Sequence, residues 1–305
     1  MRPVLVLRAL GLGDALTGVP ALRGLRRRYG DRPLLLAGSL PVSSWLARLG
    51  LVDDVIPATG LSGRPPGLGL GQHDAVNLHG RGPQSHLLLQ AGDPADLIAF
   101  DCVAAGHLRG CPWQVDEHEV DRWCRLVAFA GGACGPEDLR LPIGGDGDGA
   151  VVVHPGAASR ARQWPVERWA EVVAELRADG HRVVLTGSET DLCAAIAADE
   201  DLSGRLSLDE LAARIASAAL VLSGDTGVAH LATAVGVRSV TLFGPVPPAW
   251  WGPCIDLDLH TVLYHGSRLG DPHADQPDEA LLRISVSEVL TAAGGQLHGT
   301  RQQSS

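Results

Sequence analysis

Residues 151–165 read VVVHPGAASRARQWP, and residues 166–180 continue as VERWAEVVAELRADG. The three valines predict a buried strand, the small residues predict a loop, and Pro165 is expected at the first position of a helix that Gly180 closes. Within that helix, apolar residues from 169 to 176 recur at i, i+3, i+4 and i+7, as one buried helix face requires. A buried strand followed by a loop and a helix is the repeating unit of a parallel α/β sheet, so this stretch predicts the fold class.

The same order of strand, small-residue loop and helix recurs throughout the chain. Apolar runs predict further strands at residues 4–8, 34–38, 54–57, 75–78, 97–100, 183–186, 220–223 and 239–243. Helical patterns are expected at 21–29, 43–49, 119–129, 207–217 and 226–235, the fourth opened by a Ser-Leu-Asp-Glu capping box. Residues 142–149 hold four glycines and two aspartates with little to bury, which predicts a linker. We therefore expect an N-terminal α/β domain at 1–145 and a C-terminal one at 146–298, facing a cleft, with 299–305 disordered.

The composition argues against several classes of function. Hydrophobic residues make up 45% of the 305 residues and charged residues 20%, enough apolar surface for ordinary cores. The net charge of −10 is unfavourable for a nucleic-acid partner or an anionic membrane surface. No apolar run reaches the length of a transmembrane helix, and the run at 4–7 is too short for a signal peptide. The six cysteines show neither a Cys-x-x-Cys pair nor zinc spacing, so we expect reduced thiols in a cytoplasmic protein without stable membrane insertion.

Residues 8–14 read RALGLGD and directly follow the first predicted strand. Glycines here let the backbone approach a ligand and leave helix-terminal amides free to bind it. A dinucleotide fingerprint would need a small residue where Leu16 stands, and an acidic residue closing the next strand, where Gly38 and Ser39 stand. A nicotinamide site is therefore disfavoured. Asp14 would place a carboxylate at the C-terminal edge of a parallel sheet, where ligands bind, and its alternative role is a helix N-cap.

Two loops of the second half fit an anionic ligand. In the stretch HPGAASRARQWP at 154–165, backbone amides could bind diphosphate oxygens while an arginine neutralises their charge, although a solvated loop with two surface arginines is the alternative. The stretch SGDTGVAH at 223–230 combines a strand end, a tight turn and a helix N-terminus, which together attract anions. Thr226 and His230 are four residues apart and share a helix face that could point into the cleft. The turn FGP at 243–245 could line a base pocket or be an ordinary turn.

Metal motifs are weak in this sequence. The Asp-x-Asp match at 146–148 falls in the expected linker, and the match at 256–258 lacks a clear strand and loop around it. Both are interpreted as chance matches. Patterns typical of a P-loop, a nucleophile elbow or a Cys/His nucleophile do not occur. We expect neither a metal site nor a cofactor.

Taken together, these stretches resemble glycosyltransferase family nine, the ADP-heptose lipopolysaccharide heptosyltransferases. The matches are, in order, GLGD at 11–14 with PAL at 20–22, HPGA at 154–157 with WP at 164–165, LTGS at 185–188, DTG at 225–227 with His230, and FGP at 243–245. They extend over nearly the whole chain and are densest from 151 to 245. The resemblance implies a GT-B fold, with two Rossmann-like, doubly wound parallel-sheet domains facing a cleft. It also implies an inverting transfer without metal, an acceptor-binding N-terminal domain and a nucleotide-sugar-binding C-terminal domain.

The same resemblance assigns roles to individual residues. Asp14 corresponds to the general base that takes the proton of the acceptor hydroxyl. Donor contacts are expected from Ser159, Arg162, Glu189, Asp225, Thr226, Gly227 and His230. Acceptor contacts are expected from Gly13, His79, Arg81 and Gln84. Arg162 stands where the family usually has lysine, and with the amides near Gly227 it would stabilise the departing diphosphate, which is otherwise the task of Mg²⁺.

The substrates and two other functions stay open at this point. The resemblance implies ADP-heptose as donor and a glycan, lipid-linked or small-molecule acceptor. A lipopolysaccharide acceptor fits less well, because the chain has no lysine, a charge of −10 and no cysteine at 264–275, where family members often carry them. A GT-B sugar-nucleotide epimerase would share the donor site without an acceptor groove. A non-catalytic nucleotide-sugar-binding module is the other alternative, against which the presence of Asp14 counts.

Overall fold

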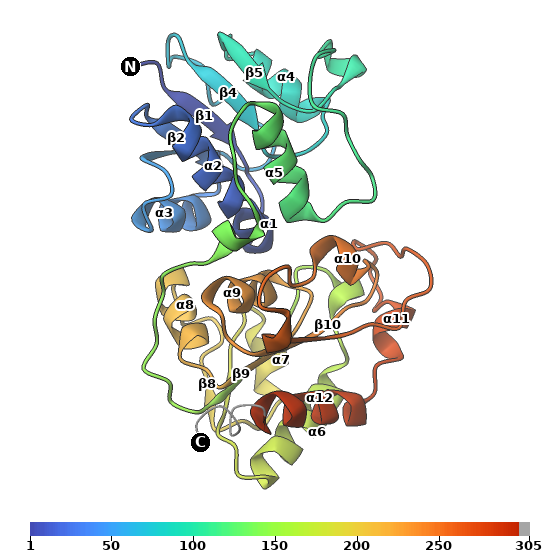
Figure 1. Cartoon of the computed structure of the whole chain (residues 1–305). Helices are drawn as coiled ribbons and strands as arrows, with labels where there is room; N and C mark the ends of the chain where they lie inside the picture. Colours follow the sequence, from blue (N-terminus) through green and yellow to red (C-terminus); the bar gives the residue numbers. More distant parts are fainter. Residues whose placement is uncertain (299–305) are drawn as a thin grey trace. The chain divides into compact units, whose positions relative to one another are not determined.

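The computed structural model describes residues 1–298 and contains two compact units (Figure 1). The first unit is Met1–Leu139 and the second begins at Arg140, whereas the sequence placed the boundary after residue 145. The disorder expected for 299–305 lies outside the described residues.

The first unit is built on a parallel sheet with the strand order β3-β2-β1-β4-β5. Its strands are β1 (Val4–Leu7), β2 (Leu34–Gly38), β3 (Asp54–Pro57), β4 (Asp74–Asn77) and β5 (Asp96–Ile98). The chain adds strands outward on one side of β1 and then returns to add β4 on the other side, which is the doubly wound arrangement predicted from the sequence. The neighbouring strands β1 and β4 are both buried along their whole length, which explains the continuous apolar run of β1, whereas β4 also buries Asp74 and Asn77.

Helices follow β1, β2, β4 and β5 of the first unit, whose strands all pair in parallel. These helices are α1 (Leu12–Thr17), α2 (Val19–Tyr29), α3 (Leu40–Arg48), α4 (Gln84–Gln90) and α5 (Glu119–Phe129), with 3₁₀ turns at Val103–Ala105 and Pro136–Leu139. Helices α2 and α5 pack against each other (Figure 1). Helices α1 and α4 were not predicted, because six or seven residues are too few for a helical period to emerge from the sequence.

The second unit contains a six-stranded parallel sheet with the order β11-β10-β9-β6-β7-β8. Its strands are β6 (Val151–His154), β7 (Val183–Leu185), β8 (Glu200–Asp201), β9 (Leu220–Gly224), β10 (Ser239–Leu242) and β11 (His260–Leu263). Numbered along the chain from β6, this order is 3-2-1-4-5-6 from β8 to β11, the order of dinucleotide-binding Rossmann domains. The α/β class predicted from residues 151–165 is confirmed.

Three of the seven α-helices that the structure describes in the second unit were predicted from the sequence, at 165–180, 207–217 and 226–235, and the other four were not. The seven helices are α6 (Val166–Ala178), α7 (Thr190–Ala194), α8 (Leu208–Ala216), α9 (Gly227–Val235), α10 (Pro248–Trp251), α11 (Glu279–Leu282) and α12 (Val286–His298), with 3₁₀ turns at Arg160–Arg162 and Leu257–Leu259. Pro165, predicted as the first helical residue, is the N-cap of α6, so the helix begins one residue later than predicted, at Val166. The capping box is confirmed, because the Ser207 amide donates to Glu210 Oε2 at 2.8 Å and the Glu210 amide donates to Ser207 Oγ at 3.3 Å.

A tryptophan pair anchors the loop before α6 to the core. The Trp164 and Trp169 rings meet edge to face with their centroids 5.0 Å apart, and both side chains are buried in the apolar cluster that α6 and α12 form with one face of the sheet. Trp164 Nε1 donates to the Ile284 carbonyl oxygen at 3.2 Å. The loop that follows β6 therefore has a fixed end.

One aspartate of each Asp-x-Asp match is held by arginine. Asp148 Oδ2 lies 2.9 Å from Arg182 Nη1, and the Asp148 carboxylate also pairs with Arg214. Hydrogen bonds from Arg214 hold the pKa of Asp148 well below its usual range. Asp256 pairs with Arg140. Residues 142–149 lack helix and strand, as expected of a linker, but Asp148 ties them to the second unit.

Two further expectations concern membrane insertion and the state of the cysteines. Among residues 1–298, no helix combines the length and the hydropathy that crossing a bilayer requires. The six cysteines are free thiols.

Candidate active site

The predicted site residues of each unit gather at one edge of that unit's sheet. Strand order reverses between β1 and β4 in the first unit and between β6 and β9 in the second. In open α/β sheets, ligands bind beyond the carboxyl ends of the strands at this reversal. Residues 8–14 follow β1 and residues 78–84 follow β4, whereas residues 155–162 follow β6 and residues 225–230 follow β9. The fold thus brings together the predicted acceptor-side residues in one unit and most of the predicted donor-side residues in the other.

Asp14 lies in the first turn of α1, and its carboxylate accepts no hydrogen bond from the described residues. Gly11 is the N-cap of this helix, so the alternative role of Asp14 as N-cap is wrong. The backbone oxygen of Asp14 accepts hydrogen bonds from the Arg8 guanidinium and, at 2.9 Å, from Thr17 Oγ1. Within residues 1–298 no group donates a hydrogen bond to the Asp14 carboxylate, and the residue is half-buried. Such a carboxylate is available to accept a proton from a bound hydroxyl.

His79 is held as a neutral imidazole beside this loop. The Ala9 amide donates to His79 Nδ1 at 3.2 Å, so the proton of the neutral ring is on Nε2. Burial and, to a smaller extent, the nearby Arg8 charge together lower the pKa of His79 to about 4. His79 can therefore donate one hydrogen bond from Nε2 at neutral pH. Arg81 and Gln84 are exposed, and their predicted acceptor contacts stay predictions, as does that of Gly13.

In the second unit, Glu189 is brought onto the loop that follows β6. A methyl group added at Gly156 would lie 2.2 Å from Glu189 Oε2, so the carboxylate rests against bare backbone. Ser188 Oγ donates to Glu189 Oε2 at 3.0 Å. Behind it, His154 Nδ1 is 3.1 Å from Thr186 Oγ1, and burial lowers the pKa of His154 to about 4. The glycine of the HPGA stretch thus makes room for an acid that can accept hydrogen bonds from sugar hydroxyls.

Arg162 extends from the β6 loop toward the end of β9. Its Nη1 lies 3.4 Å from the Asp225 carbonyl oxygen and 4.0 Å from Asp225 Oδ2. The Arg162 Nε group is buried without a hydrogen-bond partner among the described residues, and so is the Thr226 hydroxyl. A methyl group at Gly224 would lie 3.1 Å from the Arg162 carbonyl oxygen, so the two loops approach each other closely. Each unpaired buried polar group costs about 1–3 kcal/mol unless a ligand or water satisfies it.

His230 lies one turn along α9 and faces an aromatic residue. Its ring centroid is 5.9 Å from that of Trp251 in α10, with the ring planes at 68°. Helix α10 follows the FGP turn at 243–245. Ser159 Oγ donates to the Ala274 carbonyl oxygen at 3.4 Å, so its hydroxyl proton is directed to the loop before α11.

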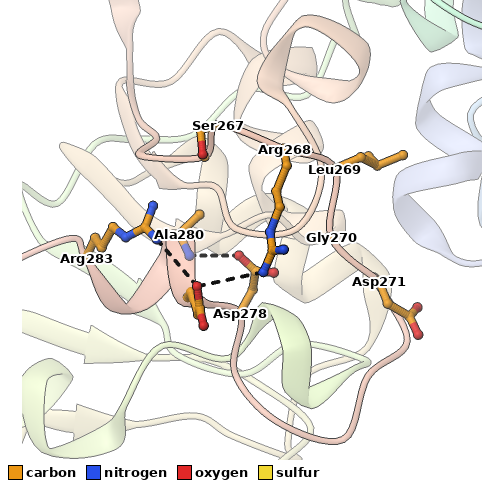
Figure 2. Close-up of a pocket in the computed structure, with 10 residues that line it drawn as sticks. Ser267, Arg268, Leu269, Gly270, Asp271, Asp278, Ala280 and Arg283 are labelled. Atoms are coloured by element: carbon orange, nitrogen blue, oxygen red, sulfur yellow. Dashed lines mark hydrogen bonds and ion pairs between the residues drawn. The ribbon is translucent and has the colours of Figure 1, made fainter.

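That loop forms a charged pocket that the sequence did not reveal (Figure 2). Residues 266–271, 278–280 and 283 line a cavity of about 320 Å³. Arg283 and Arg268 both pair with Glu279, at 3.4 and 3.9 Å, and Asp278 Oδ1 accepts from the Ala280 amide at 2.8 Å. The Gly270 amide donates to the Pro245 carbonyl oxygen at 2.8 Å. The pocket therefore adjoins the FGP turn, but no aromatic side chain lines it to stack on a base.

Comparison with known proteins places the chain in a family. The family model for glycosyltransferase family 9 (heptosyltransferase) matches residues 113–269, just over half of the chain. The lipopolysaccharide heptosyltransferase 2 of Escherichia coli K12 is 30% identical over 151 residues, which cover 45% of this chain and 43% of that protein. The chain thus spans less than half the length of the curated relatives it matches.

Two solved structures share the fold over almost the entire chain. The E. coli ADP-heptose lipopolysaccharide heptosyltransferase II superimposes with a TM-score of 0.77 at 20% identity, covering 98% of this chain and 99% of that one. The E. coli heptosyltransferase WaaC with ADP gives a TM-score of 0.72 at 19% identity, covering 97% and 100%. These likenesses confirm the GT-B fold class, and the family match confirms the resemblance read from the motifs. The chain belongs to glycosyltransferase family 9.

Proposed function

We propose that this chain is an inverting glycosyltransferase that moves heptose from ADP-heptose to an acceptor hydroxyl without a metal ion. The observation that carries the proposal is the pair of unpartnered buried donors, Arg162 Nε and the Thr226 hydroxyl, on facing loops at the start of the nine-residue helix α9. Membership of family 9 and the position of these loops at the strand-order reversal support it.

The donor would bind through its diphosphate and its ribose. The guanidinium of Arg162 and the first amides of α9 offer positive charge, which a diphosphate requires. Glu189, resting on Gly156, offers a carboxylate for ribose hydroxyls. The buried Asp225 carboxylate would repel a diphosphate, so it is better suited to hydroxyls of the donor sugar. The WaaC structure contains ADP, which supports an adenine nucleotide here as well.

Transfer would proceed as a single displacement. The acceptor oxygen attacks the anomeric carbon while the bond from that carbon to the diphosphate oxygen breaks, so the configuration inverts. Asp14 takes the proton of the attacking hydroxyl, and Arg162 with the α9 amides stabilises the negative charge on ADP. The charge of Arg162 and the helix terminus thus takes the place of a divalent cation.

A thermal-shift panel followed by product analysis tests this proposal. ADP at 100 times its dissociation constant should stabilise the protein by about 2.7 kcal/mol. UDP and GDP at the same concentration should stabilise it less. If no nucleotide stabilises the protein, the donor site is wrong. If ADP-heptose is converted to an isomer without any acceptor, the chain is an epimerase. If it is bound but neither isomerised nor transferred to glycan, lipid-linked or small-molecule acceptors, the chain is a binding module.

A further inference from the structure

We propose that Arg8 is a positioning residue, which holds helix α1, the element that bears Asp14, onto the ends of β1 and β4. The inference rests on the proposed function in that Asp14 is taken as the base. The hydrogen bonds of Arg8 go to two segments that are far apart in sequence, helix α1 and the loop after β4. Its Nε donates to the Asp14 carbonyl oxygen, its Nη1 to the Leu78 carbonyl oxygen, and its Nη2 to Thr17 Oγ1 at 2.9 Å.

These contacts connect the two strands at the strand-order reversal of the first unit. Asp14 belongs to α1, which follows β1, and Leu78 is the residue directly after β4, 70 residues from Arg8. A planar guanidinium presents its donors in a fixed fork, so one side chain can serve both carbonyl groups and a hydroxyl. A lysine ammonium is a single point of charge and cannot reproduce this geometry.

Helix α1 depends on outside partners because it is short. With only six residues, its last four carbonyl groups include that of Asp14, which also accepts from the Gly18 amide at 3.2 Å. A helix this short is marginal without tertiary contacts. A cation among its C-terminal carbonyls is favourable for the helix dipole, and Arg8 supplies that cation. The direction of the Asp14 side chain therefore depends on Arg8.

The surroundings of Arg8 are built to accept a buried guanidinium. Arg8 is 3% exposed, and burial lowers its pKa while Asp14 and Glu119 act to raise it. Glu119 Oε1 lies 3.7 Å from Arg8 Nη2, and the Trp123 ring centroid lies 4.8 Å from the guanidinium carbon. A methyl group at Gly18 would come within 2.8 Å of Arg8 Cδ. A glycine, a carboxylate and an aromatic ring thus enclose this one side chain.

The residue next to Arg8 orients the second candidate group of this unit. The Ala9 amide donates to His79 Nδ1 at 3.2 Å, and His79 directly follows Leu78, whose carbonyl oxygen Arg8 holds. A displaced Arg8 would therefore disturb both Asp14 and His79. Because a misplacement of about 1 Å can cost about 10²-fold in rate, the expected loss of kcat is of that size.

The test compares Arg8→Lys with Arg122→Lys. Arg122 pairs with the same Glu119 carboxylate and is 7% exposed, but its remaining hydrogen bonds and a second ion pair go to residues 114–117, away from α1. Hydrogen exchange should show lost protection at residues 9–18 in Arg8→Lys and native protection there in Arg122→Lys. The kcat should fall about 10²-fold only in Arg8→Lys, with ADP affinity unchanged in both.

A second variant keeps the test decisive if Arg8→Lys does not fold. Thr17→Val keeps the side-chain volume but removes the hydroxyl that accepts a hydrogen bond from the Arg8 guanidinium and donates one to the Asp14 carbonyl oxygen. Because one of the two lost hydrogen bonds has a charged donor, kcat should fall by at least about 10-fold. Equal losses in Arg8→Lys and Arg122→Lys, or unchanged exchange at 9–18, would overturn the inference. Absence of transfer by the wild-type protein would instead overturn the proposed function, because hydrogen exchange is read without activity.

Discussion

Replacing Arg162 by alanine is expected to weaken ADP binding with little effect on folding. A quarter of the side chain is exposed, and its contacts to Asp225 are long, at 3.4 and 4.0 Å. Its Nε is buried without a partner in the described part of the chain, so truncation also removes an unsatisfied group. The melting temperature should therefore stay close to that of the wild type. In the complex, Arg162 would make a charge-assisted bond to the diphosphate, whose loss costs about 1.5–3 kcal/mol.

This free energy corresponds to about 10- to 150-fold in the dissociation constant of ADP. Isothermal titration calorimetry measures it directly. Arg160→Ala is the matched control, because Arg160 lies in the same 3₁₀ turn, carries the same charge and is exposed. For Arg160→Ala we expect the dissociation constant of ADP to change less than about 2-fold, because exposed charged groups contribute little interaction free energy. Equal losses in the two variants would indicate a general charge effect, and unchanged affinity in Arg162→Ala would refute the diphosphate site.

Three further outcomes follow from other parts of the molecule. Transfer should persist in EDTA, since Arg162 and the α9 amides supply the positive charge; loss of turnover that Mg²⁺ or Mn²⁺ restores would refute the metal-free mechanism. Gly156→Ala should displace Glu189 and weaken ADP binding about 10-fold, whereas Gly144→Ala, with open space at its Cβ, should leave ADP binding unchanged. Equal dissociation constants of ADP in the two variants would contradict a role of Glu189 in donor binding. The Asp148 carboxylate, whose pKa is lowered by hydrogen bonds from Arg214, contributes its full stabilisation above the unfolded pKa of about 4 and loses it progressively as pH falls from there through the lower folded pKa. The difference in melting temperature between wild type and Asp148→Asn should therefore stay constant from pH 7 to about pH 5 and shrink below about pH 4; a difference that is unchanged at pH 3 would contradict the pairing.

Much of the fold could be predicted because its central strands are buried on both faces. The run at 151–154 is a strand over the predicted residues, and the strand predicted at 75–78 is β4 shifted by one residue. Helix signals were reliable where capping was local, as at Ser207 and Glu210. Edge strand β11 was missed because three of its four residues are only half-buried and carry no continuous apolar run.

The candidate site was predictable only in part. Motif order located the loops at the strand-order reversal, and the glycine of HPGA and the start of α9 are where the motifs placed them. The role of Arg8 could not be predicted from the sequence, because its partners Leu78 and Glu119 are distant in sequence and become its neighbours only in the folded unit. The same holds for the pocket at 266–271, 278–280 and 283, whose two segments are joined by folding rather than by a pattern.

The role of Asp14 is tested most directly by the turnover of Asp14→Asn. Asparagine has nearly the same shape but cannot accept a proton at neutral pH, and no described group donates to the carboxylate that is replaced. Asp121→Asn is the matched control, since Asp121 is also an acid in the first turn of a helix, α5. If Asp14 is the general base, kcat should fall about 10²–10⁴-fold in Asp14→Asn while the melting temperature and ADP affinity stay near the wild type. A variant that retains more than about a tenth of the wild-type kcat would contradict Asp14 as the general base.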